Sequence, residues 1–274
     1  MAVAATETIS TTEPTGFDGY PNSRDLLEKY AGYSADEIED AVLSLRDRAW
    51  ETFPFPRIGA FDFLDLALSN RTRVYHKLLT RLQAGDTFLD VGRCLGHDIR
   101  KLVFDGAPAE NMFGADLLQG YVDLGYNLFR DRDTLKTKFV QANVLDDITT
   151  GAWPELVGKF DTVSFSLVLH CFPWERQVAM LERGVAVLKE GKLGTTTTGT
   201  ACGVEEAPVE DWNGKVPVHN PEPFRKLMAE VEAKTGTKWK VDVALDNCYS
   251  RSDPRYSWIA PKMKRLVFEL TRVG

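Results

Sequence analysis

The chain of 274 residues has a formal net charge of −7 at pH 7, and 43% of its residues are hydrophobic, which predicts one large globular domain with a sizeable core. The acidic balance argues against a nucleic-acid partner, because phosphate binding needs a basic face. No apolar run approaches the roughly 20 residues of a membrane-spanning helix, so we expect no membrane association.

The N-terminal part of the chain divides into a tail and a helical segment. Residues 1–20 are rich in Thr, Ala, Ser and Glu and predict a disordered tail. Residues 21–84 form the N-terminal helical segment, in which Ser34 and Glu37 have the spacing of a capping box and predict the start of a helix. Two prolines, Pro54 and Pro56, should end that helix, and a second helix is expected over Thr72–Leu82.

From residue 87 onward, short apolar runs alternate with amphipathic stretches. The expected strands are Thr87–Val91, Met112–Ala115, Lys138–Ala142, Phe160–Leu167, Lys192–Thr198, Trp239–Leu245 and Arg265–Thr271. The expected helices are Asp98–Phe104, Gly120–Arg130, Trp174–Leu188 and Pro221–Thr235. This alternation predicts an α/β core over residues 85–274, with a seven-stranded, mostly parallel sheet covered by helices on both faces. The last two strands should pair as an antiparallel hairpin.

The cysteines give no sign of a disulfide framework or of a metal site. They are Cys94, Cys171, Cys202 and Cys248, and no two of them form a C-x-x-C pair. We therefore expect free thiols in a reducing compartment and no bound metal. The N-terminus also has no basic region followed by an apolar stretch, as a secretory signal would have, so we expect a cytoplasmic protein.

The strongest motif follows the first strand, in the sequence FLDVGRCLG over Phe88–Gly96. Asp90 lies inside the strand, and Gly92 and Gly96 lie in the turn that leads to the next helix. Glycine lets the backbone turn sharply and approach a ligand closely, and α/β sheets bind ligands beyond the carboxyl ends of their strands. A tight strand-to-helix turn without a ligand would use the same glycines.

Two further strand ends carry polar side chains. Asp116, followed by Leu117, ends the second strand, where a carboxylate can accept both hydroxyls of a ribose. Asn143, followed by Val144, ends the third strand, where an amide can bind the adenine edge while the valine packs on the ring. The alternatives are a helix N-cap for the aspartate and a turn for the asparagine.

The pattern fits S-adenosylmethionine (SAM) better than a nicotinamide cofactor. The dinucleotide fingerprint G-x-G-x-x-G is absent, because Cys94 occupies the middle glycine position. No tyrosine is followed four residues later by lysine, as in short-chain dehydrogenases. Asp90 suits the amino group of SAM better than a pyrophosphate. These residues predict a class I SAM-dependent methyltransferase fold.

Several strings of the sequence resemble fungal methyltransferases of meroterpenoid biosynthesis, of the austinol and terretonin type. They are Arg46–Trp50, Gly96–Pro108, Leu128–Arg132, Thr235–Trp239 and the pair Trp174 and Gln177. We expect residues 21–84 to form a helical lid over the substrate pocket. The resemblance implies a homodimeric SAM-dependent methyltransferase of secondary metabolism. It implies O-methylation of a small apolar intermediate, often on a carboxyl group. It also implies that Asp116-Leu117 and Asn143-Val144 contact SAM.

Arg93 departs from the family pattern, in which this position is small or carries a thiol. The arginine would either pair with the SAM carboxylate as a charged fork or crowd the cofactor. This departure leaves open a methyltransferase-fold enzyme that catalyses cyclisation or isomerisation of a natural product instead of methylation. A third alternative, which no residue specifically favours, is a non-catalytic SAM-binding subunit.

His170 is the candidate catalytic base, because it follows the fourth strand, where acceptor and methyl donor should meet. A carboxylic acid acceptor is already ionised at pH 7 and needs no base, whereas a phenol does. The alternative for His170 is a structural role, and His97 has the same two possibilities beside the cofactor. The aromatic residues between Trp50 and Phe63, with Phe172 and Trp174, would either wall an apolar pocket or belong to the core.

Overall fold

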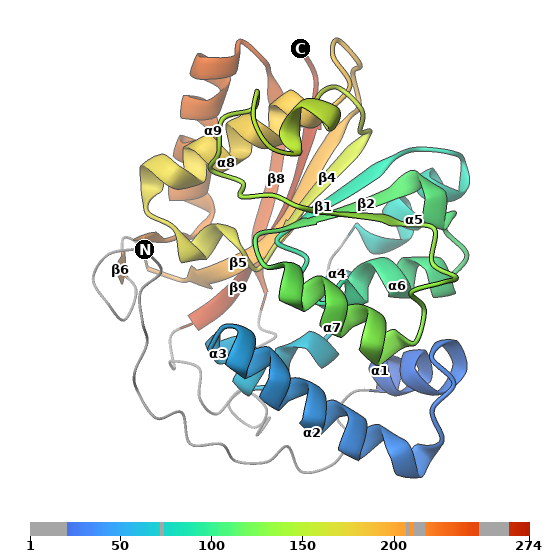
Figure 1. Ribbon diagram of the computed structural model, residues 1–274. Coiled ribbons are helices and arrows are strands. Elements are labelled where there is room, and N and C mark those ends of the chain that lie inside the picture. The colour runs from blue at the N-terminus through green and yellow to red at the C-terminus, as the bar shows by residue number, and fades with distance from the viewer. Residues whose placement is uncertain (1–20, 72–73, 207–208, 211–216, 247–262) are drawn as a thin grey trace.

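The computed structural model describes residues 21–71, 74–206, 209–210, 217–246 and 263–274. The strands of its main sheet are β1 (Phe88–Val91), β2 (Met112–Asp116), β3 (Lys138–Gln141), β4 (Thr162–Ser166), β5 (Thr196–Val204), β8 (Trp239–Asp246) and β9 (Met263–Arg272). They lie in the order β3-β2-β1-β4-β5-β9-β8 (Figure 1). The first five strands are parallel, and β9 runs antiparallel to both β5 and β8. The predicted seven-stranded, mostly parallel sheet is confirmed.

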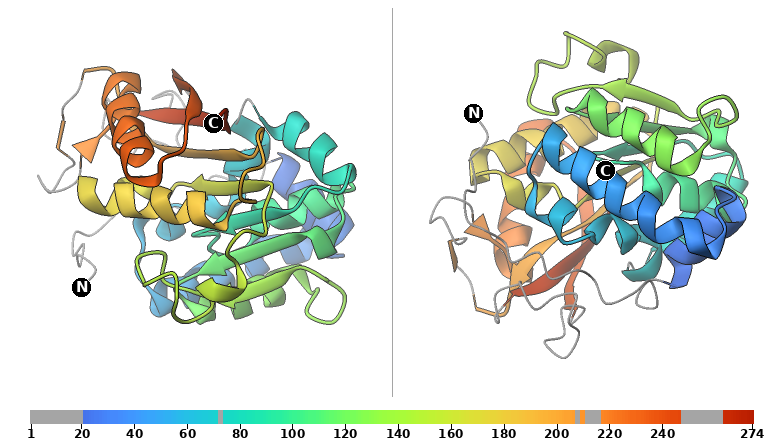
Figure 2. Two further views of the ribbon diagram at one scale, coloured as in Figure 1. Left: turned by 90° about the horizontal axis from the view of Figure 1, so that it is seen from above. Right: turned by 60° about the horizontal axis from the view of Figure 1, so that its bottom comes forward.

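Helices cover both faces of this sheet, because successive residues of its strands point to opposite sides (Figure 2). In β1, Phe88 packs with residues of α5 (Tyr75–Gln83) and α6 (His97–Phe104). Its neighbour Leu89 packs on the other face with residues of α8 (Trp174–Val187) and α9 (Pro221–Thr235). A further helix, α7 (Gln119–Phe129), lies on the same face as α5 and α6. The core therefore has three layers.

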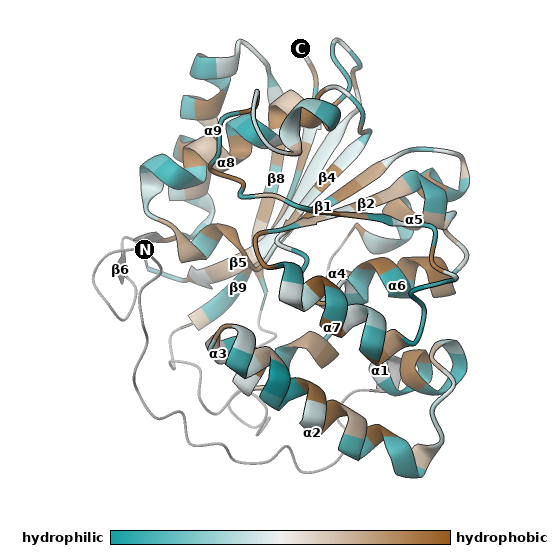
Figure 3. Ribbon diagram, viewed as in Figure 1, coloured by the Kyte–Doolittle hydropathy of each residue, from teal (hydrophilic) through white to brown (hydrophobic). Residues whose placement is uncertain are grey.

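The N-terminal helical segment packs against the part of the core that follows β1 and β2. Before α5, its last helix, the elements of this segment are α1 (Pro21–Asp25), η2 (Leu26–Tyr30), α2 (Ala35–Thr52), α3 (Pro56–Gly59), η3 (Asp62–Leu64) and α4 (Ala67–Arg71). The predicted capping box of Ser34 and Glu37 is present at the start of α2. Leu45 of α2 shares one apolar cluster with Leu95 and with Leu124 of α7. In Figure 3, α2 alternates between hydrophobic and hydrophilic residues, as a helix with one buried side does.

The fifth strand begins later and runs further than predicted: it was expected over Lys192–Thr198 and is β5. Lys192 lies in a turn, where its ammonium pairs with the buried carboxylate of Asp161. The strand continues through Gly199, where a Cβ would lie 2.3 Å from the carbonyl oxygen of Phe165 in β4. The glycine permits this close approach of two backbones, so it continues the strand rather than ending it.

Other expected boundaries shift by smaller amounts. The helix expected over Thr72–Leu82 is α5, and residues 72–73 lie outside the described part. Two short strands, β6 (Val209–Glu210) and β7 (Pro217–Val218), form a separate hairpin that the sequence did not predict. The tail of residues 1–20 and Cys248 also lie outside the described residues. The other three cysteines are free thiols, as predicted.

Among the described residues, no helix is both long and apolar enough to cross a membrane. The same residues contain no cluster of three or more His, Cys, Asp or Glu side chains arranged to hold a metal ion.

Candidate functional site

The three predicted polar strand ends meet at one edge of the sheet, because β1, β2 and β3 are parallel neighbours. Hydrogen bonds between backbones join these ends. The Gly92 N–H donates to the carbonyl of Ala115 at 2.9 Å, and the Ala142 N–H donates to the carbonyl of Asp116 at 2.9 Å. The edge is therefore one continuous surface on which a ligand can contact all three strand ends.

The glycine loop, Gly92–Gly96, follows β1 in a left-handed backbone conformation. Gly92 and Gly96 have φ values of 72° and 69°, and Cys94 between them has φ 53°. A Cβ on Gly92 would lie 2.9 Å from Cγ2 of Val168, which follows β4. The absent side chain leaves the loop lying directly against the end of β4. A non-glycine residue at positive φ is strained, and such strain clusters at ligand sites.

Asp116 organises the glycine loop and also remains able to bind a ligand. Its Oδ2 accepts the Cys94 N–H at 2.7 Å, and its Oδ1 accepts the Leu118 N–H at 3.0 Å. Burial raises the pKa of this carboxyl, while the backbone N–H groups and the Arg93 charge oppose the rise. Each carboxylate oxygen can accept a second hydrogen bond. The next side chain, Leu117, is 55% exposed and presents an apolar surface beside the carboxylate.

Two more carboxyl groups are buried on the α5–α6 face of the sheet. Burial raises the pKa of Asp90 in β1 to about 7, while the Ser164 hydroxyl and the Arg93 charge oppose the rise. Burial, followed by the charge of Asp90, raises the pKa of Asp98 in α6 to about 8. The Leu68 N–H donates to both oxygens of Asp98 at 3.2 and 3.3 Å. Asp98 therefore fastens α4 of the N-terminal helical segment to the helix that follows the glycine loop.

We expect Asp98→Asn to flatten the pH dependence of stability between pH 6.5 and 8. Asp98 keeps its proton in the folded protein up to about pH 8, whereas an unfolded aspartate loses it near pH 3.9. The folded state therefore binds more protons in this window, and the free energy of unfolding falls as the pH rises, by about 1 kcal/mol per pH unit. Urea unfolding at pH 6.5, 7.25 and 8 measures the slope.

Two histidines with a lowered pKa do not obscure this slope. Burial lowers the pKa of His97 and of His219 to about 4, so these groups raise stability with pH until the unfolded histidines, with a pKa near 6.5, have lost their protons, and both wild type and Asp98→Asn carry this contribution. Asp36→Asn, on the exposed side of α2, is the control and should keep the wild-type slope. Equal slopes in wild type and Asp98→Asn would contradict the prediction.

Arg93 lies between the sheet and the glycine loop, with 3% of the residue exposed. Its side chain crosses Gly114 of β2, where a Cβ would lie 2.0 Å from the arginine Cδ, and its guanidinium stacks 4.0 Å from the centroid of the Phe139 ring. Nη1 donates to the carbonyl of Cys94 at 3.0 Å, but Nε and Nη2 have no hydrogen-bond partner among the described residues. Burial lowers its pKa to about 10, which leaves the group charged at pH 7.

Asn143 takes part in a turn of its own loop. Its Nδ2 donates to Oδ1 of Asp146 at 2.8 Å, and its Oδ1 accepts the Leu145 N–H at 3.1 Å. The Trp153 Nε1–H donates to its carbonyl at 2.8 Å, and Val144 is buried in the core beside that indole. The structure thus places both residues at the expected strand end, with the turn contacts that the alternative interpretation describes. Adenine binding by Asn143 stays a prediction.

His170 lies in η6 (Leu169–Cys171), directly after β4, and its Nδ1 is buried without a partner among the described residues. A hydrogen bond from α8 holds Phe172, two residues after His170, and a second one holds its donor, Gln177. Gln177 donates from Nε2 to the carbonyl of Phe172 at 2.8 Å, and its Oε1 lies 2.7 Å from Nε2 of His219. Because the Gln177 oxygen can only accept, His219 is the donor. Gln177 of α8 therefore supports the chain directly after η6, the element that carries His170.

The predicted aromatic group divides between surface and core. Phe61 and Phe63 are buried in the apolar cluster of the N-terminal helical segment, and Trp50 is 36% exposed. Phe172 and Trp174 are partly buried against the main core. His97 is partly buried, with its Nδ1 unpartnered among the described residues and its Nε2 3.8 Å from the Asp98 carboxylate.

Sequence reasoning missed a buried ion pair behind the glycine loop. Arg100 of α6 is 0% exposed and donates from Nε and Nη2 to the two oxygens of Asp131 at 2.7 and 2.9 Å. Its Nη1 donates to the carbonyls of Leu95 and Gly96 at 2.7 and 3.3 Å. Both charged residues lie within strings that carry the family resemblance. Their place in these strings could have marked both residues as important, but the sequence does not show that they pair, because the pairing depends on the tertiary structure.

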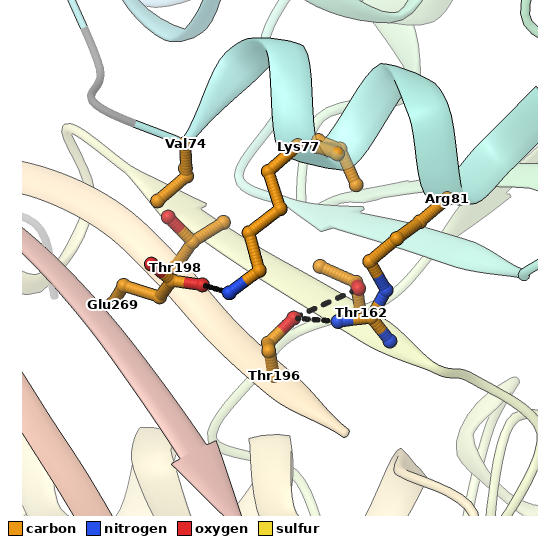
Figure 4. A pocket seen from close by; sticks show the side chains of 8 residues that line it. Val74, Lys77, Arg81, Thr162, Thr196, Thr198 and Glu269 are labelled. Atoms are coloured by element: carbon orange, nitrogen blue, oxygen red, sulfur yellow. Dashed lines mark hydrogen bonds and ion pairs between the residues drawn. The ribbon is translucent and has the colours of Figure 1, made fainter. Parts of the chain in front are cut away.

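Figure 4 shows a different cavity, of about 10 Å³, between α5 and the strands β4, β5 and β9. Its lining residues are Val74, Lys77, Leu78, Arg81, Thr162, Thr196, Thr198 and Glu269. Thr162 and Thr196 begin β4 and β5, so this cavity lies toward the amino ends of the strands, away from the glycine loop. Its volume is that of about one water molecule, and it is not a candidate ligand site.

The sheet order and the strand-end site define a class I methyltransferase fold, and solved structures share it. Magnesium protoporphyrin IX methyltransferase from Synechocystis, solved with bound S-adenosylhomocysteine (SAH), has a TM-score of 0.51 at 13% identity, covering 84% of this chain and 94% of that one. The 4+2 cyclase SpnF has a TM-score of 0.53 at 15% identity, covering 72% and 80%. Since one of these proteins is a cyclase, the fold alone does not fix the reaction.

Sequence relatives identify the family. Residues 15–64 match the model described as the meroterpenoid methyltransferase N-terminal domain. The O-methyltransferase phiE from Fungal sp. is 38% identical over 80% of this chain and 74% of its own length. The O-methyltransferase atr3 from Stereocaulon alpinum is 36% identical over 92% and 73%. The Asnovolin E/Chermesin D methyltransferase nvfJ from Aspergillus novofumigatus is 34% identical over 80% and 79%. The chain belongs to this family of fungal methyltransferases of meroterpenoid pathways and is an O-methyltransferase.

Proposed function

We propose that this methyltransferase binds SAM across the carboxyl ends of β1, β2 and β3 and methylates an oxygen of a small, apolar natural-product intermediate. The observation that carries the proposal is the pair Asp116-Leu117. A buried carboxylate with free acceptor capacity stands beside a leucine that is 55% exposed. That combination suits a ligand with a hydroxylated ribose on one side and a flat apolar ring on the other.

The surrounding residues fit the rest of the cofactor. The absence of a side chain at Gly92 lets the glycine loop lie against Val168, which brings the loop after β1 to the end of β4, where the methyl group would be transferred. Asp90 supplies a carboxyl group with a pKa of about 7. The amino group of SAM is a cation, and a cation beside this carboxyl would lower its pKa and favour the carboxylate. Asn143 and Val144 would bind the adenine from β3. Arg93 lies beneath the loop, and we assign it a supporting role through the Cys94 carbonyl.

Bound SAM would supply a methyl group already activated for in-line displacement. The residues of this chain hold the acceptor oxygen in line, which is worth several kcal/mol of the barrier. His170 follows β4, and its buried Nδ1 has no partner in the described part of the chain; we propose that it lies near the acceptor. It would take a proton from a hydroxyl acceptor and would orient a carboxylate acceptor, which needs no base.

The acceptor class rests on the apolar surroundings and on the relatives. Phe172 and Trp174 follow His170, and the aromatic N-terminal helical segment packs against the glycine loop. The relative nvfJ is named for Asnovolin E and Chermesin D. We therefore propose a carboxyl or hydroxyl group of an intermediate in fungal-type secondary metabolism as the acceptor. We also propose a cytoplasmic homodimer in which residues 21–84 cover the substrate pocket of the core, residues 85–274.

Calorimetric titration with SAH tests the cofactor site without an acceptor. We expect wild-type protein to bind SAH and Asp116→Ala to bind it at least about tenfold more weakly, because a hydrogen bond to a charged group contributes about 1.5–3 kcal/mol. Asp147→Ala is the matched control. Asp147 lies in the loop after β3, where its carboxylate accepts the Thr149 N–H at 2.8 Å. Absence of binding by wild type, or equal loss in both variants, would refute the proposed site.

A further inference from the structure

The ion pair behind the glycine loop fixes the loop through its carbonyl groups. Arg100 uses one edge of its guanidinium for Asp131 and its remaining nitrogen, Nη1, for the carbonyls of Leu95 and Gly96. A guanidinium is planar and rigid, so its orientation toward the carboxylate determines where Nη1 meets the loop. The Phe129 ring lies 4.6 Å from the guanidinium carbon and restricts it further. The position of the glycine loop therefore depends on the position of Asp131.

The N-terminal helical segment supplies a third member of this network. The hydroxyl of Tyr30, in η2, donates at 2.8 Å to Oδ2 of Asp131, the same oxygen that accepts the Arg100 Nε–H. Its ring meets the Phe129 ring edge-on at 6.3 Å between centroids. Burial and the charge of Asp131 raise the pKa of Tyr30, which keeps the hydroxyl a donor. The contact joins residues 101 positions apart in the sequence.

The glycine loop is in close contact with the backbone of α7. A Cβ on Gly125 of that helix would lie 2.3 Å from the carbonyl oxygen of Leu95, one of the two carbonyls that Arg100 holds. Because the helix backbone abuts the loop here, a shift of the Leu95 carbonyl toward α7 is blocked, and Arg100 sets the remaining freedom.

We propose that Arg100, Asp131 and Tyr30 are positioning residues for the cofactor, and that the N-terminal helical segment thereby takes part in cofactor binding. The expected effect on cofactor binding rests on the proposed cofactor site, whereas the positioning of the glycine loop rests on the contacts of Arg100, Asp131 and Tyr30. By linkage, a ligand that binds the ordered loop also strengthens the contact of η2 with Asp131.

The chain offers a matched pair of tyrosines for the test. Tyr30→Phe removes one hydroxyl bonded to Asp131, and Tyr75→Phe removes one hydroxyl bonded to Asp105, at the other end of α6. Both variants keep the ring and remove one tyrosine–carboxylate hydrogen bond, but only Tyr30→Phe touches the partner of Arg100. Circular dichroism and thermal melting establish that both fold.

Two readouts separate positioning from general stability. Hydrogen exchange of ligand-free protein follows the amides of residues 92–97, of which the Gly92, Cys94 and Gly96 N–H groups are hydrogen-bonded. We expect Tyr30→Phe alone to speed their exchange and to raise the Kd for SAH about threefold to tenfold. Equal loop exchange in the two variants would overturn the proposed positioning. Faster exchange in Tyr30→Phe without SAH binding by wild type would support the positioning and refute the cofactor site instead.

Discussion

Asp131→Ala should destabilise the protein by about 3–5 kcal/mol, because it leaves the fully buried charge of Arg100 without its carboxylate. The arginine would keep its hydrogen bond to the Leu95 carbonyl at 2.7 Å, but a neutral carbonyl does not compensate a buried cation. Such a loss is a large part of the stability of an ordinary domain. Urea unfolding at pH 7 measures it, provided the transition is two-state.

A surface ion pair in the same region is the control. Arg132 donates to Asp123 at 2.9 Å, and their side chains are 53% and 48% exposed. Asp123→Ala should change the free energy of unfolding by no more than about 1 kcal/mol, because exposed pairs are screened by water and salt. If Asp131→Ala costs no more than Asp123→Ala, the buried pair does not stabilise the glycine loop as the contacts indicate.

The sequence predicts the fold well where one local signal determines the structure. The capping box at Ser34 begins α2, and helix α9 has the predicted bounds, Pro221–Thr235. The alternation of Phe88 and Leu89 between two apolar clusters shows that β1 is buried on both faces, as a central strand of a parallel sheet is. These features depend on neighbours in the sequence, which the sequence shows directly.

Prediction fails where a distant partner decides the conformation. Lys192 reads as the start of a strand, but the carboxylate of Asp161 holds it in a turn. The carboxylate pairs with Lys192 across 31 positions of the sequence, which no local pattern shows. Nothing local to Arg100 shows that Asp131 will neutralise it. The candidate site was thus located from sequence by its strand ends, whereas its supporting contacts required the tertiary structure.

Arg93 shows how a family position can change when its neighbour allows it. The resemblance implies a small or thiol-bearing residue here, which would leave space over β2. In this chain the arginine fills that space, and the absence of a side chain at Gly114 accommodates its Cδ. Its counter-charges are Asp116 and Asp90, which raise its pKa against the effect of burial. Gly114 and Arg93 should therefore behave as one packing unit.

A double-mutant cycle tests this coupling. Gly114→Ala should destabilise the wild type by about 3 kcal/mol. The new Cβ would lie 2.0 Å from the Arg93 Cδ, and the arginine is buried, so it has little room to move away. In an Arg93→Cys background the same change should cost at least about 1 kcal/mol less, since the clashing atoms are gone. The ring of Phe139, 2.7 Å from the same Cβ, limits the rescue.

Gly199→Ala is the matched glycine substitution, because its Cβ would lie 2.3 Å from the Phe165 carbonyl oxygen in a strand of the same sheet. Its clash is with backbone atoms and with the Phe268 ring, so Arg93→Cys should not relieve it. Urea unfolding of the two cycles gives two coupling energies. A coupling for Gly114 that does not exceed the coupling for Gly199 would mean that Arg93 can leave its place over β2 at little cost. The arginine would then be free to approach a ligand at the strand ends, as its alternative role beside the SAM carboxylate requires.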